Sequence, residues 1–101
     1  MFLDKMLAME NFSFLQKSPR EINQLIAERI RLVRKRKKMS QQLLSKKSGV
    51  SYGSVKRFEQ SGEISLISLT KIAVALEVSL ELENLFADMP LSIEEIINEQ
   101  N

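Results

Sequence analysis

The chain has 101 residues, of which 44% are apolar, and this length and composition favour one small domain with its own core. It contains no cysteine and no histidine, which excludes disulfides, thiolate metal sites, thiol nucleophiles and imidazole bases. The net charge of +2 hides an asymmetry, because residues 29–57 hold eleven Lys or Arg and no acid, whereas residues 58–101 hold nine acids and one Lys. A basic block of this kind attracts polyanions.

The first strong helix signal begins at Ser18, which is followed by Pro19 and, three residues after the serine, by Glu21. This is a capping box with proline at the favoured first helical position. An apolar stripe at helical spacing follows, formed by Ile22, Ile26, Ile30 and Val33. The basic run 34–38 favours the end of this helix, because cations are stabilised near a helix C-terminus.

Two short helices are predicted next. Ser40 is placed to cap a helix over residues 41–48, and Gly49 is placed to end it in a left-handed conformation. Ser51 then caps a third helix that runs to about Gln60, and Gly62 marks the turn that follows.

A fourth and a fifth helix complete the expected domain. Ser65 caps the fourth, and its inward-facing residues are predicted to be Leu66, Leu69, Ile72, Ala73 and Leu76. Ser79 is predicted to cap the fifth, which Pro90 ends and which carries Leu80, Leu82, Leu85 and Phe86.

The sequence therefore predicts an all-α, compact five-helix domain over residues 18–88, with a helix-turn-helix at 41–60. Residues 1–17 form an N-terminal extension rich in Phe and Met, and Met9 is an alternative start. Residues 89–101 form an acidic C-terminal tail, in which a second capping box beginning at Ser92 predicts one or two further helical turns.

The informative segment is Gln41–Gln60. The positions that must pack to fix the angle between its two helices are Leu44, Val50, Val55 and Phe58, and Ser45 is small where the helices come closest. Once these positions are committed to packing, the side chains left on the outer face of the second helix are Ser51, Tyr52, Gly53, Lys56 and Arg57. This is the pattern of a helix-turn-helix whose second helix lies in the major groove of DNA.

From about Ile26 to Phe86, the chain resembles the XRE family of phage-repressor-like regulators, of the lambda repressor and Cro type. The resemblance implies that base edges are read by Ser51, Tyr52, Gly53, Lys56 and Arg57. It implies that phosphates are held by Lys38, Ser40, Gln41, Lys46, Lys47 and Ser54, with the N–H groups at the start of the first helix of the pair pointing at the anion. It also implies a structural ion pair between Arg34 and Glu59.

Two positions depart from the usual family pattern. Ser45 stands where alanine is usual and is small enough to fit. Gly53 lies inside a helix, where glycine costs about 1 kcal/mol relative to alanine. Either the DNA backbone approaches closely enough to need a residue without a side chain, or the glycine is simply tolerated; the sequence leaves both readings open.

These features predict a sequence-specific regulator of transcription that binds double-stranded DNA. We expect it to be a repressor that binds an inverted repeat as a homodimer. The alternative is the antitoxin of a toxin–antitoxin pair, which would bind a protein partner and repress its own operon through the same fold. We expect no enzymatic activity, cofactor or metal, because no spacing assembles a base with a nucleophile or a metal site. With no membrane-spanning run and no signal peptide, a cytoplasmic location is expected.

Overall fold

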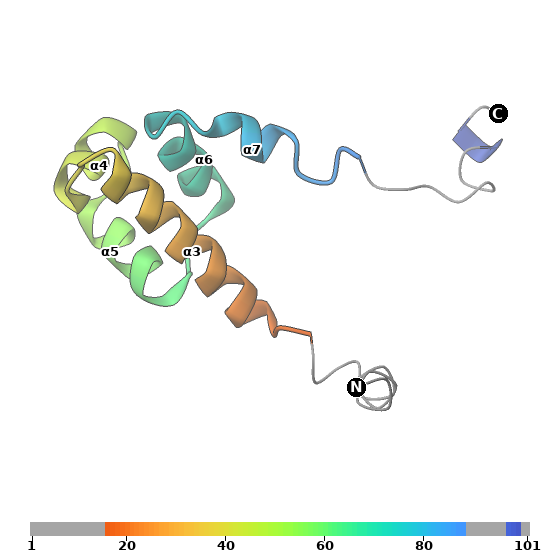
Figure 1. Cartoon of the computed structure of the whole chain (residues 1–101), viewed down its shortest axis with the longest axis horizontal. Helices are drawn as coiled ribbons and strands as arrows, with labels where there is room; N and C mark the ends of the chain where they lie inside the picture. Colours follow the sequence, from red (N-terminus) through yellow and green to blue (C-terminus); the bar gives the residue numbers. More distant parts are fainter. Residues whose placement is uncertain (1–15, 89–96, 100–101) are drawn as a thin grey trace.

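The computed structural model describes residues 16–88 and 97–99, and five helices make up its main body (Figure 1). In chain order they are α3 (Pro19–Arg36), α4 (Gln41–Ser48), α5 (Tyr52–Ser61), α6 (Leu66–Ala75) and α7 (Ser79–Glu83). The described residues contain no β-strand, so the predicted all-α class is confirmed. None of the described helices is both long and apolar enough to span a membrane. The predicted N-terminal extension and the tail's capping box lie almost entirely outside the described residues.

The long helix α3 begins as the sequence predicts. The Glu21 N–H donates to Ser18 Oγ at 3.1 Å, and the Ser18 N–H donates to Glu21 Oε1 at 3.1 Å, which completes the capping box. The backbone hydrogen bond with Ser18 lowers the pKa of Glu21. The helix ends at Arg36, before the basic run is complete, because Lys38 adopts a left-handed conformation with φ of 57°.

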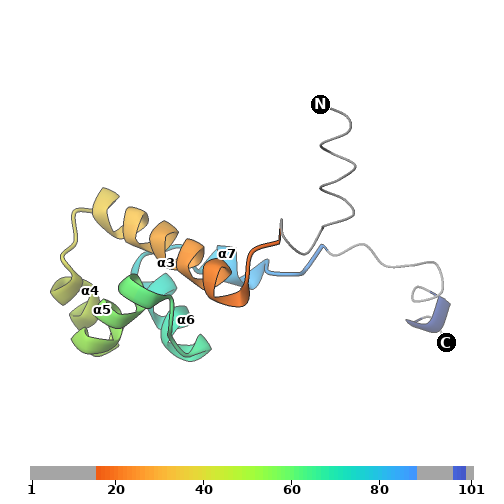
Figure 2. The same ribbon diagram turned by 90° about the horizontal axis from the view of Figure 1, so that it is seen from below.

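The helices form two layers around a small core. In Figure 2, α3 lies along one side and α4, α5 and α6 lie beneath it, while α3 packs against α5 and α4 packs against both α5 and α6. The buried residues between these layers are Ala27, Leu44, Val50, Val55, Phe58, Ile72, Ala73 and Leu76. The four packing positions predicted in the α4–α5 pair are therefore all buried.

Two glycines end helices in the left-handed conformation, which was predicted for Gly49, and their surroundings differ. Gly49 caps α4 with φ of 77°, and a Cβ atom there would meet no atom within 4 Å. Gly62 caps α5 with φ of 80° and is buried; its Cβ would lie 2.7 Å from the backbone carbon of Asn23 and 2.8 Å from the nitrogen of Gln24. The glycine at 62 thus lets the end of α5 touch the backbone of α3.

The end of the domain around α7 differs from the sequence-based expectation. Val78 is the N-cap of α7, Ser79 is its first helical residue, and no side-chain hydrogen bond caps this helix. The helix ends at Glu83, so it stops well before Pro90, and Leu85 and Phe86 lie beyond it. A helix of five residues gains too few backbone hydrogen bonds to persist without packing.

The inward face of α6 was also predicted one residue too wide. Ile72, Ala73 and Leu76 are buried and Leu69 is partly buried, but the Leu66 side chain is 71% exposed. Leu66 is the first residue of α6, so the apolar spacing of the helix did not show that this residue remains exposed.

Candidate nucleic-acid interface

The turn between α4 and α5 is fixed by hydrogen bonds as well as by packing. Ser45 Oγ donates to the Val50 carbonyl at 2.6 Å, and the Val50 N–H donates to Ser48 Oγ at 3.1 Å. Val50 itself is buried in the core. The serine that departs from the usual alanine therefore bonds the turn, and it joins the end of α4 to the start of α5.

The inner side of α5 is held to α3 by an ion pair. Arg34 donates through Nε to Glu59 Oε2 at 2.7 Å and through Nη2 to Glu59 Oε1 at 2.8 Å. Its third nitrogen, Nη1, donates to the Met39 carbonyl at 2.7 Å. The Arg34 and Glu59 side chains are only 9% and 3% exposed. All three guanidinium nitrogens thus donate hydrogen bonds inside the fold, and the buried group is not presented to an external ligand.

The Glu59 carboxylate also accepts a hydrogen bond from Gln41 Nε2, at 3.0 Å. Burial acts to raise the pKa of Glu59, but the hydrogen bonds from Arg34 and Gln41 outweigh it, and the pKa lies below the ordinary value. The hydrogen bonds that Arg34 donates to Glu59 in turn raise the pKa of Arg34. Both groups are therefore charged at neutral pH. The first residue of α4 is tied to α5 through this network.

The outer face of α5 is exposed and polar. The exposed residues on this face are Ser51, Tyr52, Gly53, Ser54, Lys56 and Arg57. Ser51 Oγ caps the helix by accepting from the Ser54 N–H at 3.1 Å, and it donates to Ser54 Oγ at 2.7 Å. The Lys56 ammonium lies 4.9 Å from the centre of the Tyr52 ring, within the range of a cation–π contact. The accessible surface therefore holds the five residues predicted from the sequence to read bases, together with Ser54, which was predicted to hold a phosphate.

Gly53 lies in the middle of that surface. A Cβ atom at this position would meet nothing within 4 Å, so no packing within the protein requires a glycine. Two explanations for the glycine remain. Either a ligand approaches the α5 backbone closely at this position, or the helix simply tolerates a glycine there.

The positions predicted to hold phosphates are spread over the α4–α5 pair: Lys38, Ser40 and Gln41 lie at the start of α4, Lys46 and Lys47 lie in its last turn, and Ser54 lies on α5. Ser40 caps α4 by accepting from the Leu43 N–H at 3.0 Å, and Lys38, Lys46 and Lys47 are exposed. The first N–H groups of a helix lack intrahelical acceptors, so the start of α4 offers donors to an anion. The Gln41 side chain is engaged by Glu59, so only its backbone is left for that purpose.

One contact on the outer face was missed from the sequence. Arg57 donates to Glu63 Oε2 through Nη2 at 2.5 Å and through Nε at 2.9 Å. Sequence patterns reveal ion pairs three or four residues apart on one helix. A pair six residues apart across a glycine turn has no comparable signal.

A short helix packed across a second, with a tight glycine turn between them and the second helix presenting a polar face to solvent, defines a helix-turn-helix domain. The family model described as Helix-turn-helix matches residues 30–82, about half of the chain. The chain belongs to this family, the XRE type of the lambda repressor and Cro, whose domain is a DNA-binding regulatory one. Comparison with the curated proteins and with the solved structures gave no match.

Proposed function

We propose that the protein is a sequence-specific transcriptional regulator that inserts α5 into the major groove of double-stranded DNA. The observation that carries the proposal is the division of α5 into two faces. Its inner face is locked by Val55, Phe58 and the Arg34–Glu59 pair, while its outer face presents Tyr52, Lys56 and Arg57 to solvent. A rigid helix with exposed donors is what base reading in the major groove requires.

Affinity would come mainly from the phosphates. Residues 29–57 contain eleven basic residues, of which Arg34 is used inside the fold. Of the exposed ones, residues 35–38 precede α4, Lys46 and Lys47 lie in its last turn, and Lys56 and Arg57 lie on the outer face of α5. Neutralising phosphates releases counterions, so binding should weaken steeply with salt.

A homodimer on an inverted repeat is part of this proposal, because one α5 contacts too few base pairs to specify a unique site. The region around α7 supports it. Leu80, Leu85 and Phe86 are 68%, 53% and 78% exposed, an unusual gathering of large apolar side chains near one end of a small domain. We propose repression as the outcome of binding.

The test is a footprint of the full chain on the DNA just upstream of its own gene, followed by a salt titration on the protected sequence. A protected inverted repeat and affinity that falls steeply with salt are expected. Absence of duplex binding at low salt, or affinity that does not change with salt, would contradict the proposal.

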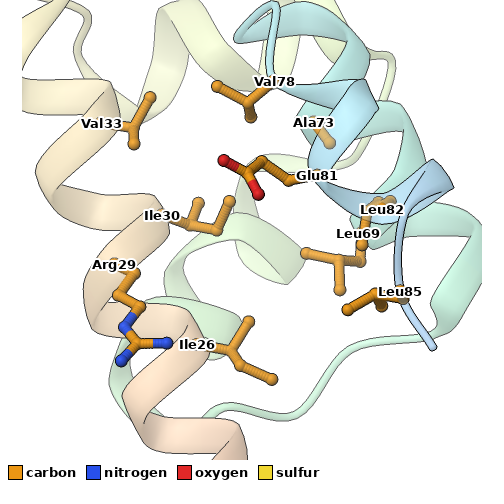
Figure 3. A pocket seen from close by; sticks show the side chains of 10 residues that line it. All are labelled: Ile26, Arg29, Ile30, Val33, Leu69, Ala73, Val78, Glu81, Leu82 and Leu85. Carbon is orange, nitrogen blue, oxygen red and sulfur yellow. The ribbon is translucent and has the colours of Figure 1, made fainter. Parts of the chain in front are cut away.

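A second candidate function is that of an antitoxin with a dedicated protein partner. An open apolar groove of about 400 Å³ favours it (Figure 3). Ile26 and Ile30 of α3 lie along one side, and Leu82 of α7 and Leu85 lie along the other, with Leu69 between them. A groove of this character fits the apolar face of a helix. Co-expression with the products of the neighbouring genes, followed by co-purification and mass determination, separates a partner complex from a homodimer.

A further inference from the structure

Glu63 occupies a defined edge of the Arg57 guanidinium. Both hydrogen bonds, from Nε and from Nη2, go to the same oxygen, Oε2. A guanidinium has five N–H donors. Of the three that remain, one on Nη1 and one on Nη2 form the end-on edge of the guanidinium, and the other on Nη1 points along the side opposite Glu63. The carboxylate thus leaves the end-on edge of Arg57 free.

The backbone fixes the carboxylate at this place. Gly62 ends α5 and turns the chain back, with its own position set by contact with the backbone of α3. Ser61 Oγ donates to the Arg57 carbonyl at 2.7 Å and accepts from the Glu63 N–H at 3.2 Å. Glu63 is therefore tied to the same helical turn that carries Arg57.

Stability does not account for this pair. The Arg57 and Glu63 side chains are 72% and 62% exposed, and exposed ion pairs contribute about 0–1 kcal/mol. A carboxylate beside a DNA-facing cation also repels phosphates and lowers affinity for every duplex. What the pair does provide is a restricted orientation of a long side chain, which lowers the conformational entropy lost on binding.

We propose that Glu63 is a positioning residue for sequence recognition: it holds the Arg57 guanidinium so that its end-on edge meets a guanine. The two nitrogens of that edge match the O6 and N7 acceptors of guanine in the major groove. Without Glu63, the side chain can swing to a phosphate and give up base contact. This inference rests on the proposed function. It makes Glu63 responsible, through Arg57, for the preference of the protein for guanine at one position of the DNA site.

The experiment uses the full chain and the footprinted duplex. It also uses three duplexes in which one guanine, the one whose replacement no longer weakens binding in Arg57→Ala, is replaced by each of the other bases. Glu63→Ala is expected to reduce discrimination between the guanine duplex and the others by about fivefold, which corresponds to about 1 kcal/mol. It should at the same time strengthen binding to a scrambled duplex. In an Arg57→Ala background, Glu63→Ala should leave discrimination unchanged.

Glu77→Ala is the matched control. Glu77 is an exposed carboxylate, 83% accessible and 3.7 Å from Lys37, so its removal changes net charge by the same amount without touching Arg57. Glu77→Ala should leave discrimination unchanged. Circular dichroism and thermal melting establish that each variant is folded.

Two results would overturn the inference while leaving the function intact. One is that Glu63→Ala changes binding to all four duplexes by a common factor, so that discrimination is the same as in Glu77→Ala. The other is that Arg57→Ala itself leaves discrimination among the duplexes unaltered. If the unmodified protein binds no duplex at low salt, the proposed function fails as well, which is a distinct outcome.

Discussion

Two arginine–glutamate pairs flank α5, and they use the same chemistry in opposite surroundings. Arg34–Glu59 lies between α3 and α5 with side chains no more than 9% exposed, whereas Arg57–Glu63 lies on the outer face with both side chains more than 60% exposed. In the inner pair both glutamate oxygens accept from Arg34; in the outer pair a single oxygen takes both bonds.

The difference shows how one face of a helix can be fixed to the core while residues on its other face can change with little loss of stability. Removing either partner of a buried pair leaves an uncompensated charge in the core, which is strongly destabilising. Removing a partner of an exposed pair leaves a charge that water solvates. Substitutions on the inner side should therefore change stability, and substitutions on the outer side should change DNA binding.

The largest expected effect breaks the inner pair. Glu59→Gln should lower the free energy of unfolding by about 3–5 kcal/mol, because Arg34 would remain buried without a counter-charge. Glu63→Gln, the matched change on the outer side, should lower it by less than about 1 kcal/mol. Urea denaturation of both variants measures the contrast. Equal losses in the two variants would remove the distinction between the faces.

The inner pair also predicts a dependence on pH. The pKa of Glu59 is lowered in the folded state, so its contribution is complete above the ordinary glutamate range and disappears as pH falls through the lowered pKa. Denaturation midpoints measured below pH 5 should therefore fall more steeply in the unmodified protein than in Glu59→Gln. Parallel curves for the two proteins would contradict this assignment.

The next effect concerns the two glycine turns. Gly62→Ala should cost about 2–4 kcal/mol, since it combines a left-handed conformation with collision against the backbone of α3. Gly49→Ala should cost only about 1–2 kcal/mol, because space is open there and only the conformation is unfavourable. Thermal melting of both variants tests the order, and a larger loss at Gly49 would show that the close contact at Gly62 is unimportant.

On the outer side, Arg57→Ala should cost about 1–3 kcal/mol on the preferred site and relax specificity at one base pair. Lys46→Ala and Lys47→Ala, on the exposed face of α4, should weaken all sequences by similar, smaller amounts and reduce the salt slope. Titrations against the operator and a scrambled duplex at two salt concentrations distinguish these outcomes. Should Arg57→Ala weaken both duplexes equally, Arg57 contacts a phosphate and reads no base.

The smallest effect separates the two readings of Gly53. Gly53→Ala should stabilise the fold by about 1 kcal/mol, because a Cβ atom meets nothing there and alanine is the better helix former. If DNA approaches the α5 backbone closely, the same variant should bind the operator more weakly. Unchanged binding together with higher stability would mean that the glycine is merely tolerated.

The sequence predicted the first four helices because each begins with a local signal. Serines at 18, 40, 51 and 65 cap α3 to α6, each by accepting from a backbone N–H three residues ahead. The glycines at 49 and 62 end α4 and α5. Such signals act between near neighbours, so they can be read without knowing the tertiary structure.

Long-range contacts were harder to predict. The Gln41–Glu59 bond joins residues eighteen apart, and the Arg57–Glu63 pair spans a turn, so neither follows from helical spacing. The end near α7 was mispredicted for a related reason. Leucine periodicity indicates which residues could be buried, but Leu85 and Phe86 lie past the helix end, where they are 53% and 78% exposed. Periodicity cannot show whether a partner surface exists.

The short connections between the helices have a consequence for how the chain reaches this structure. Only Lys37–Ser40, Gly49–Ser51 and Gly62–Ser65 separate α3, α4, α5 and α6 from one another, so neighbouring helices meet after little chain has to be closed into a loop. Helical domains rich in such local contacts fold in microseconds to milliseconds. We therefore expect a molecule that loses its structure to refold on this timescale.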